Sequence, residues 1–482
     1  MVSSFDTYQT SLTGRYCSKE MSTLFSQRSR HSTWRKLWLG LAECEKELGI
    51  DTITPEALEQ MKAHLEVTDE DFDVARVEEQ LRRHHVHAFG AVAPAAAGII
   101  HYGATSCFVT DNAELILVRE ALDLLINKLA KVIYNLSAFA LKWKAEPTLA
   151  YTHLQAAQLI TVGKRAAQWA QDLMLDLESI EHVRDQLKFR GAQGTTGTQA
   201  SFMEIFQNDS AKCDKLNDLL CEKFGFSACY DVSTQTYTRK VDLIVANAVA
   251  GIGSSAQKIT GDIRHLAHWK EIEEPYESSQ IGSSAMAYKR NPMRSERVYS
   301  LARELLSKPP TFANTHADQW CERTLDDSAV RRIDIPETML LADAICIGLD
   351  NITNGLVVYP NRIAAHVQSE LPFMLTESIL MKLCAKGASR QEGHEQIRVL
   401  SNEAGSVVKN EGKPNDLVDR IRKNTFFQPI WGELDSMLKA DLYIGRSVEI
   451  VDKYCGPGGP VERALAPYMQ YIKSSTTAEL KV

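Results

Sequence analysis

Residues 280–292 (QIGSSAMAYKRNP) place a glycine, two serines, a lysine, an arginine and an asparagine within 13 positions. Gly282 allows backbone conformations that other residues avoid, and successive N–H groups in such a loop can cradle an anion. A cation stabilises the alkoxide of a nearby serine, so Ser283 near Lys289 is a candidate base or nucleophile. An ordinary polar loop is the alternative.

Two further segments carry polar side chains suited to proton transfer or ligand binding. His153 lies between a hydroxyl and an amide in the sequence YTHLQ, and it is a candidate acid or base. A structural histidine is the alternative. Residues 190–201 are rich in glycine and hydroxyl groups, which suits a loop facing a ligand. They do not fit the G-x-x-x-x-G-K-[ST] pattern of a nucleoside-triphosphate loop.

Residues 323–332 contain three arginines and a serine. Guanidinium groups bind phosphate or carboxylate through paired N–H donors, so this segment predicts a small-anion site. A surface ion-pair network with Asp326 and Asp327 is the alternative. The whole chain has a net charge of −8, so a basic site of this kind must be local.

Long helices must position these segments. Apolar residues recur with helical spacing over 111–145, where Asp111 is the expected N-cap, and over 155–190, 236–270 and 334–354. Strand-like alternation is rare. Long helices with wide apolar faces need partners, which predicts an all-α bundle that continues across subunits. A bundle confined to one chain is the alternative.

The helical pattern is shorter towards both ends of the chain. Short helices are expected near 21–49 and 55–65, the second with Thr54 as its cap and Pro55 at its first position. We therefore expect three domains: an N-terminal helical domain over 1–105, a central long-helix domain over 106–358 and a C-terminal helical domain over 359–482.

Composition restricts the class of protein. The chain has 482 residues, 44% of them hydrophobic and 24% charged, which excludes a disordered or collagen-like chain. Its ten cysteines include no C-x-x-C pair, which fits free thiols in a reducing compartment. We find no signal peptide and no run of about 18 apolar residues, so we expect a cytoplasmic protein without membrane or nucleic-acid partners.

The polar segments together resemble a known family. Residues 282–292 resemble the G-S-S-x-M-P-x-K-x-N-P signature of the fumarase/aspartase superfamily, with Ala287 in place of its proline. Residues 100–107 (IHYGATSC) and 151–158 (YTHLQAAQ) resemble its other two signature regions. Residues 235–240 (QTYTRK) and 322–328 (ERTLDDS) narrow the resemblance to the eukaryotic type of the adenylosuccinate lyase family.

The resemblance covers nearly the whole chain and implies a fold, an assembly and an activity. It implies a three-domain all-α fold in which long helices form the core of a homotetramer, with each active site built from three subunits. It implies β-elimination of fumarate from adenylosuccinate, giving AMP, and from the succinylated ribotide SAICAR, giving AICAR, without a metal or cofactor. The alternatives are an impaired or structural paralogue and another superfamily member such as an argininosuccinate lyase. The latter has no use for a phosphate cluster.

The resemblance also implies roles for individual residues. Ser283 would be the general base, assisted by Lys289, and His153 the general acid, its ring oriented by Glu296. The succinyl carboxylates would be held by Thr105, Ser106, Thr152 and Asn291. The ribotide phosphate and sugar would be bound by Arg15, Tyr16, Arg323, Ser328 and Arg332. The remaining candidates for nucleotide or substrate contact are Arg83, His101, Gln235 and Arg297.

One departure from the family pattern stands out. The family reads R-H-D-V-M-A-H-V-H-x-F-G, whereas residues 83–90 read RHHVHAFG, so D-V-M-A is missing between His84 and His85. The family's first histidine and aspartate contact substrate; His84 matches the histidine, and the aspartate has no counterpart. Four residues make up about one helical turn and about 6 Å of helix. A true deletion at this point would impair activity, whereas an omission from the sequence would not.

Overall fold

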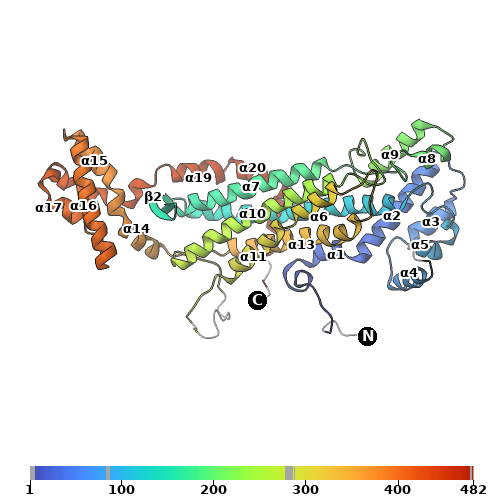
Figure 1. Ribbon diagram of the computed structural model, residues 1–482, viewed down its shortest axis with the longest axis horizontal. Helices are drawn as coiled ribbons and strands as arrows, with labels where there is room; N and C mark the ends of the chain where they lie inside the picture. The colour runs from blue at the N-terminus through green and yellow to red at the C-terminus, as the bar shows by residue number, and fades with distance from the viewer. Residues whose placement is uncertain (1–5, 83–86, 277–285, 287, 478–479, 481–482) are drawn as a thin grey trace.

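The computed structural model describes residues 6–82, 87–276, 286, 288–477 and 480. Its centre is a bundle of long helices that run along the longest axis of the molecule (Figure 1). The helices that pack against one another there are α6 (Ser106–Lys142), α7 (Val162–Gln186), α10 (Lys240–His268), α11 (Met293–Leu306) and α13 (Asp327–Thr353). The predicted all-α fold is confirmed.

α6 is the longest of these helices and lies inside the bundle. It has 37 residues, and its buried side chains include Leu122, Leu125, Leu129 and Leu136. At 1.5 Å per residue it spans about 55 Å. The predicted start at Asp111 is wrong, because Thr105 is the N-cap and Asp111 is buried within the helix.

α6 also corrects the expectation that the chain has no membrane-length apolar segment. By length and composition α6 could cross a membrane, yet 61% of its most apolar 18-residue window is buried inside the protein. It packs against α7 and α13, and against α2 (Gln27–Glu47) at one end. This burial is that of a core helix.

The N-terminal helices gather at one end of the bundle (Figure 1). The helix expected near 21–49 is two helices, α1 (Lys19–Leu24) and α2, because the Ser26 side chain accepts a hydrogen bond from Ser29 N and starts a new helix. The cap predicted at Thr54 is confirmed: its side chain accepts from Ala57 N. The remaining N-terminal helices at this end are α3 (Pro55–Ala63), α4 (Asp69–Arg82) and α5 (His87–Val92).

The C-terminal segment begins at the opposite end of the molecule and then returns along the bundle (Figure 1). The helices at that far end are α14 (Pro360–Met374), α15 (Thr376–Ala385), α16 (Arg390–Glu411) and α17 (Leu417–Lys423). Those that return are α19 (Ser447–Cys455) and α20 (Pro460–Leu465), which pack against α6, and α7 also contacts α19.

A β-hairpin replaces the first part of the helix expected over 155–190. β1 (Pro147–Thr152) pairs with β2 (Gln155–Thr161), and α7 begins only after Thr161, whose side chain caps it. The two residues of the hairpin loop, His153 and Leu154, have φ of 54° and 59°. A two-residue loop with positive φ at both positions matches the right-handed twist of paired strands.

Candidate active site

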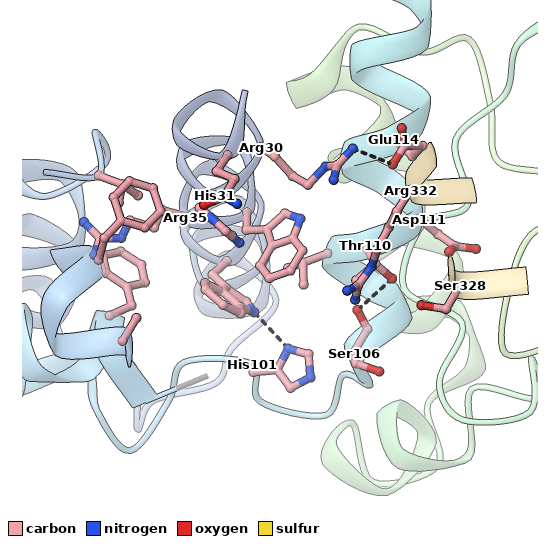
Figure 2. A pocket seen from close by; sticks show the side chains of 18 of the residues that line it. Arg30, His31, Arg35, His101, Ser106, Thr110, Asp111, Glu114, Ser328 and Arg332 are labelled. Carbon is pink, nitrogen blue, oxygen red and sulfur yellow. Dashed lines mark hydrogen bonds and ion pairs between the residues drawn. The ribbon is translucent and has the colours of Figure 1, made fainter. Parts of the chain in front are cut away.

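A cavity of about 1200 Å³ lies between α2, the start of α6 and the start of α13 (Figure 2). Five of the residues predicted from sequence line it: His101, Ser106, Arg323, Ser328 and Arg332. They come from segments more than 200 positions apart along the chain, so the fold brings two of the predicted polar segments together. The cavity is the candidate binding site.

The arginine segment forms one side of this cavity. Figure 2 shows Ser328 and Arg332 near Ser106 and Thr110. Arg332 is exposed and Ser328 half-buried, so both are available to a ligand. Arg323 is held by its neighbours: its Nη1 lies 3.0 Å from Gln235 Oε1, to which it donates. Arg323 and Gln235, from two of the predicted segments, are therefore in direct contact.

The start of α6 faces the same cavity. Ser106 is exposed at the first turn, and Thr105 caps the helix without a side-chain hydrogen bond to it. The first N–H groups of a helix have no partner within the helix, and the helix dipole favours an anion there. A carboxylate or phosphate at this end of α6 would therefore be stabilised by backbone and hydroxyl donors together.

His101 closes one corner of the cavity. Trp38 Nε1 donates to His101 Nδ1 at 2.8 Å (Figure 2). Because Nδ1 accepts, the proton of the neutral ring is on Nε2. His101 also has a positive φ of 67°, which fixes its backbone at the turn that leads into α6.

A buried ion-pair network lies directly behind the arginine segment. Arg239 donates from Nε to Asp327 at 2.7 Å and from Nη1 to Asp111 at 3.0 Å. Asp111 also accepts from Tyr237 N at 2.9 Å. The aspartate that precedes Ser328 is thus fixed by Arg239, which lies outside the segment, and this pair is buried and is not the surface network of the alternative.

Arg331 extends the network to α10. Its Nε donates to Asp242 at 2.7 Å, and its Nη2 donates to the Tyr237 hydroxyl at 2.6 Å. Burial raises the pKa of Asp111, but the Arg239 and Arg331 guanidiniums outweigh this effect and hold that pKa below its usual value. Asp111 therefore stays ionised beneath the cavity wall.

Sequence reasoning missed the wall that α2 contributes. Arg30, His31 and Trp34 line the cavity from α2, and Glu114 faces them from α6 (Figure 2). Arg30 Nη2 lies 3.7 Å from Glu114 Oε2. Burial raises the pKa of Glu114 although Arg30 opposes the shift. The one-turn spacing of Arg30 and Trp34 was the available signal, but charged residues on a helix usually indicate a solvated face.

A second group of predicted residues lies around the start of α11, outside this cavity lining. Lys289 is exposed and Asn291 half-buried just before the helix, and Glu296 is exposed in its first turn. The Arg297 guanidinium lies over the Tyr16 ring, 5.3 Å from its centroid. Arg15 precedes Tyr16 in the short π-helical turn Leu12–Tyr16.

A third group lies on the β-hairpin. Thr152 and His153 are both exposed. The hairpin is anchored far from the cavity: Tyr151 stacks on Trp269 at 4.4 Å between ring centroids, and β1 packs on α14. The cavity is at the first residue of α6 and the hairpin follows its last, so about 55 Å of helix separates them. One chain does not bring His153 to the arginine segment.

Three predicted residues, Arg83, His84 and Ser283, lie outside the described residues, as does the position of the D-V-M-A gap. Within the described part of the chain, no group of three or more His, Cys, Asp or Glu side chains could hold a metal ion.

Comparison with known proteins places the chain in a family. A family model described as "Lyase" matches residues 26–306, and one described as "Adenylosuccinate lyase C-terminus" matches residues 372–454. The adenylosuccinate lyase of Saccharomyces cerevisiae is 52% identical over 472 residues, covering 97% of this chain and 98% of the yeast protein. The chain belongs to the adenylosuccinate lyase family.

Other adenylosuccinate lyases and solved lyase structures agree with this assignment. The adenylosuccinate lyase of Schistosoma mansoni is 47% identical over 456 residues, covering 93% of this chain and 94% of that protein. The crystal structure of a fumarate lyase from Mesorhizobium sp. BNC1 matches the fold with a TM-score of 0.78 at 21% identity, covering 94% of this chain and all of that one. The predicted family, superfamily fold and lyase class are confirmed.

Proposed function

We propose that the protein is a carbon–nitrogen lyase that eliminates fumarate from adenylosuccinate, giving AMP, and from SAICAR, giving AICAR. The observation that carries this proposal is the match over 97% of the chain to an adenylosuccinate lyase. The cavity supports it, because the hydroxyls of Ser106 and Ser328 and the guanidinium of Arg332 line one wall and suit an anionic ribotide.

The chemistry requires a base, an acid and a means of stabilising charge. Removing a proton beside a carboxylate leaves a carbanion that must be held as an enediolate, while the departing nitrogen must receive a proton. Ser283 is the proposed base, with Lys289 lowering the pKa of its hydroxyl and stabilising the enediolate. His153 is the proposed acid, and Glu296 the group that orients its ring.

The substrate's two anionic parts need separate sites. For the ribotide phosphate and sugar we propose Arg15, Tyr16, Arg323, Ser328 and Arg332. For the succinyl carboxylates we propose Thr105, Ser106, Thr152 and Asn291. For the remaining nucleotide and substrate contacts we propose Arg83, His101, Gln235 and Arg297, and we propose His84 as a further catalytic residue. No step of this elimination calls for a metal or cofactor.

We also propose that the active site is completed in a homotetramer. The separation of His153 from the arginine segment by the length of α6 supports this, because residues of both groups are assigned to one reaction. Large apolar side chains remain exposed along the bundle helices at Leu175, Ile244 and Ile333, of which Leu175 is 58% and Ile333 56% exposed. Apolar surface of this kind on long helices favours association with further copies.

The remaining proposals concern domains, location and partners. We propose the three-domain division at 105 and 358, which is supported by α6 beginning at Ser106 and by β4 (Val357–Val358) ending at Val358. We propose a cytoplasmic enzyme whose partners are its small-molecule substrates and its own copies, without membrane or nucleic-acid partners.

The decisive experiment follows the ultraviolet absorbance of adenylosuccinate with purified protein and identifies fumarate and AMP as products. Stoichiometric conversion supports the proposal and shows that the sequence near His84 permits activity. A folded assembly without turnover overturns the proposal and favours an impaired paralogue. In the active protein, Ser283→Ala is expected to abolish turnover and keep substrate binding, and near-normal kcat would remove Ser283 from the role of base.

The acid is tested separately. His153→Gln is expected to block proton delivery to the leaving nitrogen, so that bound substrate persists through a single turnover. Rapid product formation when this variant, in molar excess, is mixed with substrate would contradict the assignment of His153 as the acid.

A further inference from the structure

Two free thiols lie close together outside the cavity lining. Cys221 is on α9 (Ser210–Phe224), and Cys229 follows in the segment that leads to Gln235. Their sulfur atoms are 3.5 Å apart. Disulfide sulfurs are about 2.05 Å apart, so bonding requires an approach of about 1.5 Å. Cys221 is buried and Cys229 half-buried, which leaves the pair within reach of a small oxidant.

The surrounding backbone holds Cys229 against its neighbours. Phe189 N donates to Ala228 O, and Tyr230 N donates to Phe189 O, both at 2.9 Å, so the main chain on either side of Cys229 is paired. A side chain at Gly191 would place its Cβ 2.5 Å from Cys229 Sγ. The absence of a side chain at Gly191, which has φ of +71°, is therefore what makes room for this thiol.

The two thiols differ in character. The hydrogen bond between them lowers the pKa of Cys221 and, together with burial, raises that of Cys229. Either sulfur can be the donor in this contact, and the lowered pKa of Cys221 favours its thiolate. Since the thiolate is the reactive form, Cys221 is the group that attacks an oxidant first.

We propose that Cys221 and Cys229 are a redox modification site that forms a reversible intramolecular disulfide. With hydrogen peroxide, the Cys221 thiol releases its proton and the thiolate attacks one oxygen. The O–O bond breaks, a sulfenic acid forms, and the departing hydroxide takes up the released proton as one water. The Cys229 sulfur then attacks the Cys221 sulfur, its proton leaves with the hydroxyl as a second water, and the S–S bond forms. The two thiols lose two electrons and peroxide gains them. A dithiol reductant reverses the change.

The site is linked by contacts to the cavity wall. Gly191, which Cys229 contacts, follows Arg190, and Arg190 Nη2 donates to Gln235 O at 2.7 Å. The Gln235 side chain in turn accepts from Arg323. Movement of Cys229 toward Cys221 changes its packing at Gly191 and can shift this chain of contacts. We therefore expect oxidation to weaken substrate binding. This effect on binding rests on the proposed function, whereas the formation of the disulfide crosslink is independent of it.

The first arm of the test measures the crosslink in the folded full-length protein. The protein is treated with hydrogen peroxide, digested without reduction and analysed by mass spectrometry. A peptide pair joined through Cys221 and Cys229, lighter by two hydrogens and separated by dithiothreitol, is the expected result. Cys221→Ser and Cys229→Ser must each abolish it, whereas Cys321→Ser, at an exposed cysteine, must leave it intact.

Two results of this first experiment would overturn the proposed disulfide. Both thiols remaining free while Cys321 is oxidised, or a crosslink that forms only in denaturant, overturns the proposal.

The second arm compares the KM for adenylosuccinate before and after oxidation in the Cys321→Ser background. A rise of about twofold or more, absent in Cys229→Ser and reversed by dithiothreitol, supports the link to the cavity. An unchanged KM in fully crosslinked protein overturns that link and leaves the crosslink established. Absence of any activity before oxidation would count against the proposed function alone.

Discussion

Glu45 is fully buried on α2, and neither of its carboxylate oxygens has a hydrogen-bond partner within the described part of the chain. Burial raises the pKa of Glu45 from its usual 4.5 to about 9. The folded protein therefore holds a proton at neutral pH that the unfolded chain releases. The stabilising contribution is complete below about pH 4.5 and is lost as pH rises towards 9.

Glu45→Gln tests this effect, because glutamine keeps the shape and cannot ionise. The variant should match the parent in free energy of unfolding near pH 4 and exceed it increasingly above that, by up to about 1.4 kcal/mol per pH unit. Urea denaturation at a series of pH values measures the difference. Glu47→Gln, at an exposed site on the same helix, should show no such trend. A pH-independent difference for Glu45→Gln would mean that Glu45 is ionised in the folded protein.

Asp111 is the opposite case to Glu45, because it is a buried carboxylate that stays charged. Asp111→Asn removes a charge that faces Arg239 and Arg331 and leaves both guanidiniums under-compensated in the interior. We expect a loss of about 3 kcal/mol in the free energy of unfolding, measured by urea denaturation at pH 7. The pair of half-buried Arg184 and exposed Asp185 is the control: Asp185→Asn should cost less than about 1 kcal/mol. Equal costs would contradict a role for burial.

At the scale of the elements, the junction of α6 and α7 leaves no room for a side chain at Gly163. A Cβ at Gly163 would lie 2.2 Å from Ala140 O and 2.6 Å from the Lys144 backbone. Backbone atoms cannot turn aside as a side chain can, so the two helices would have to separate. The bundle thus depends on glycine at this position for a spatial reason and not for backbone flexibility.

Gly163→Ala should therefore destabilise the protein by about 3 kcal/mol. Gly405 lies inside α16, and a Cβ added there would have no neighbouring atom within 4 Å. Gly405→Ala should instead stabilise the protein by about 1 kcal/mol through helix propensity. Thermal and urea denaturation of the two variants measure whether each substitution lowers or raises the free energy of unfolding. Stabilisation by Gly163→Ala would show that the α6–α7 junction can open without cost.

At the scale of the whole molecule, the length of α6 determines which of the proposed active-site residues a single chain can bring together. It places Arg332 and His153 in separate regions, and the proposed reaction needs both. In an assembly whose sites combine these residues from different chains, two inactive variants can restore each other, because some sites receive both intact residues. In sites built within one chain, every site keeps one defect.

Mixing Arg332→Ala and His153→Gln chains in equal amounts, by co-expression or by denaturation and joint refolding, should recover roughly a quarter of the parent activity if the chains assort at random. Each variant alone should remain inactive. The fumarate assay measures recovery, and analytical ultracentrifugation checks that the mixture assembles as the parent does. No recovery in a correctly assembled mixture would contradict shared sites.

Much of this protein was predictable from local sequence patterns. Helical spacing of apolar residues predicted α6, α10 and α13, and Thr54–Pro55 predicted the start of α3, because burial and capping repeat over a few neighbouring positions. The motif segments predicted the family and its lyase class. The His153–Leu154 hairpin was missed, since its strands are held by contacts with Trp269 and α14 that no short window of sequence contains.

Long-range packing decided the rest. The partners of Asp327 and Asp111 could not be read from the sequence, because Arg239 is 88 positions from Asp327 and 128 from Asp111. The cavity wall formed by Arg30 and Trp34 depends on where α2 crosses α6. The separation of His153 from the arginine segment follows from a straight helix of about 55 Å, since a rigid helix keeps its two ends apart however its faces are packed.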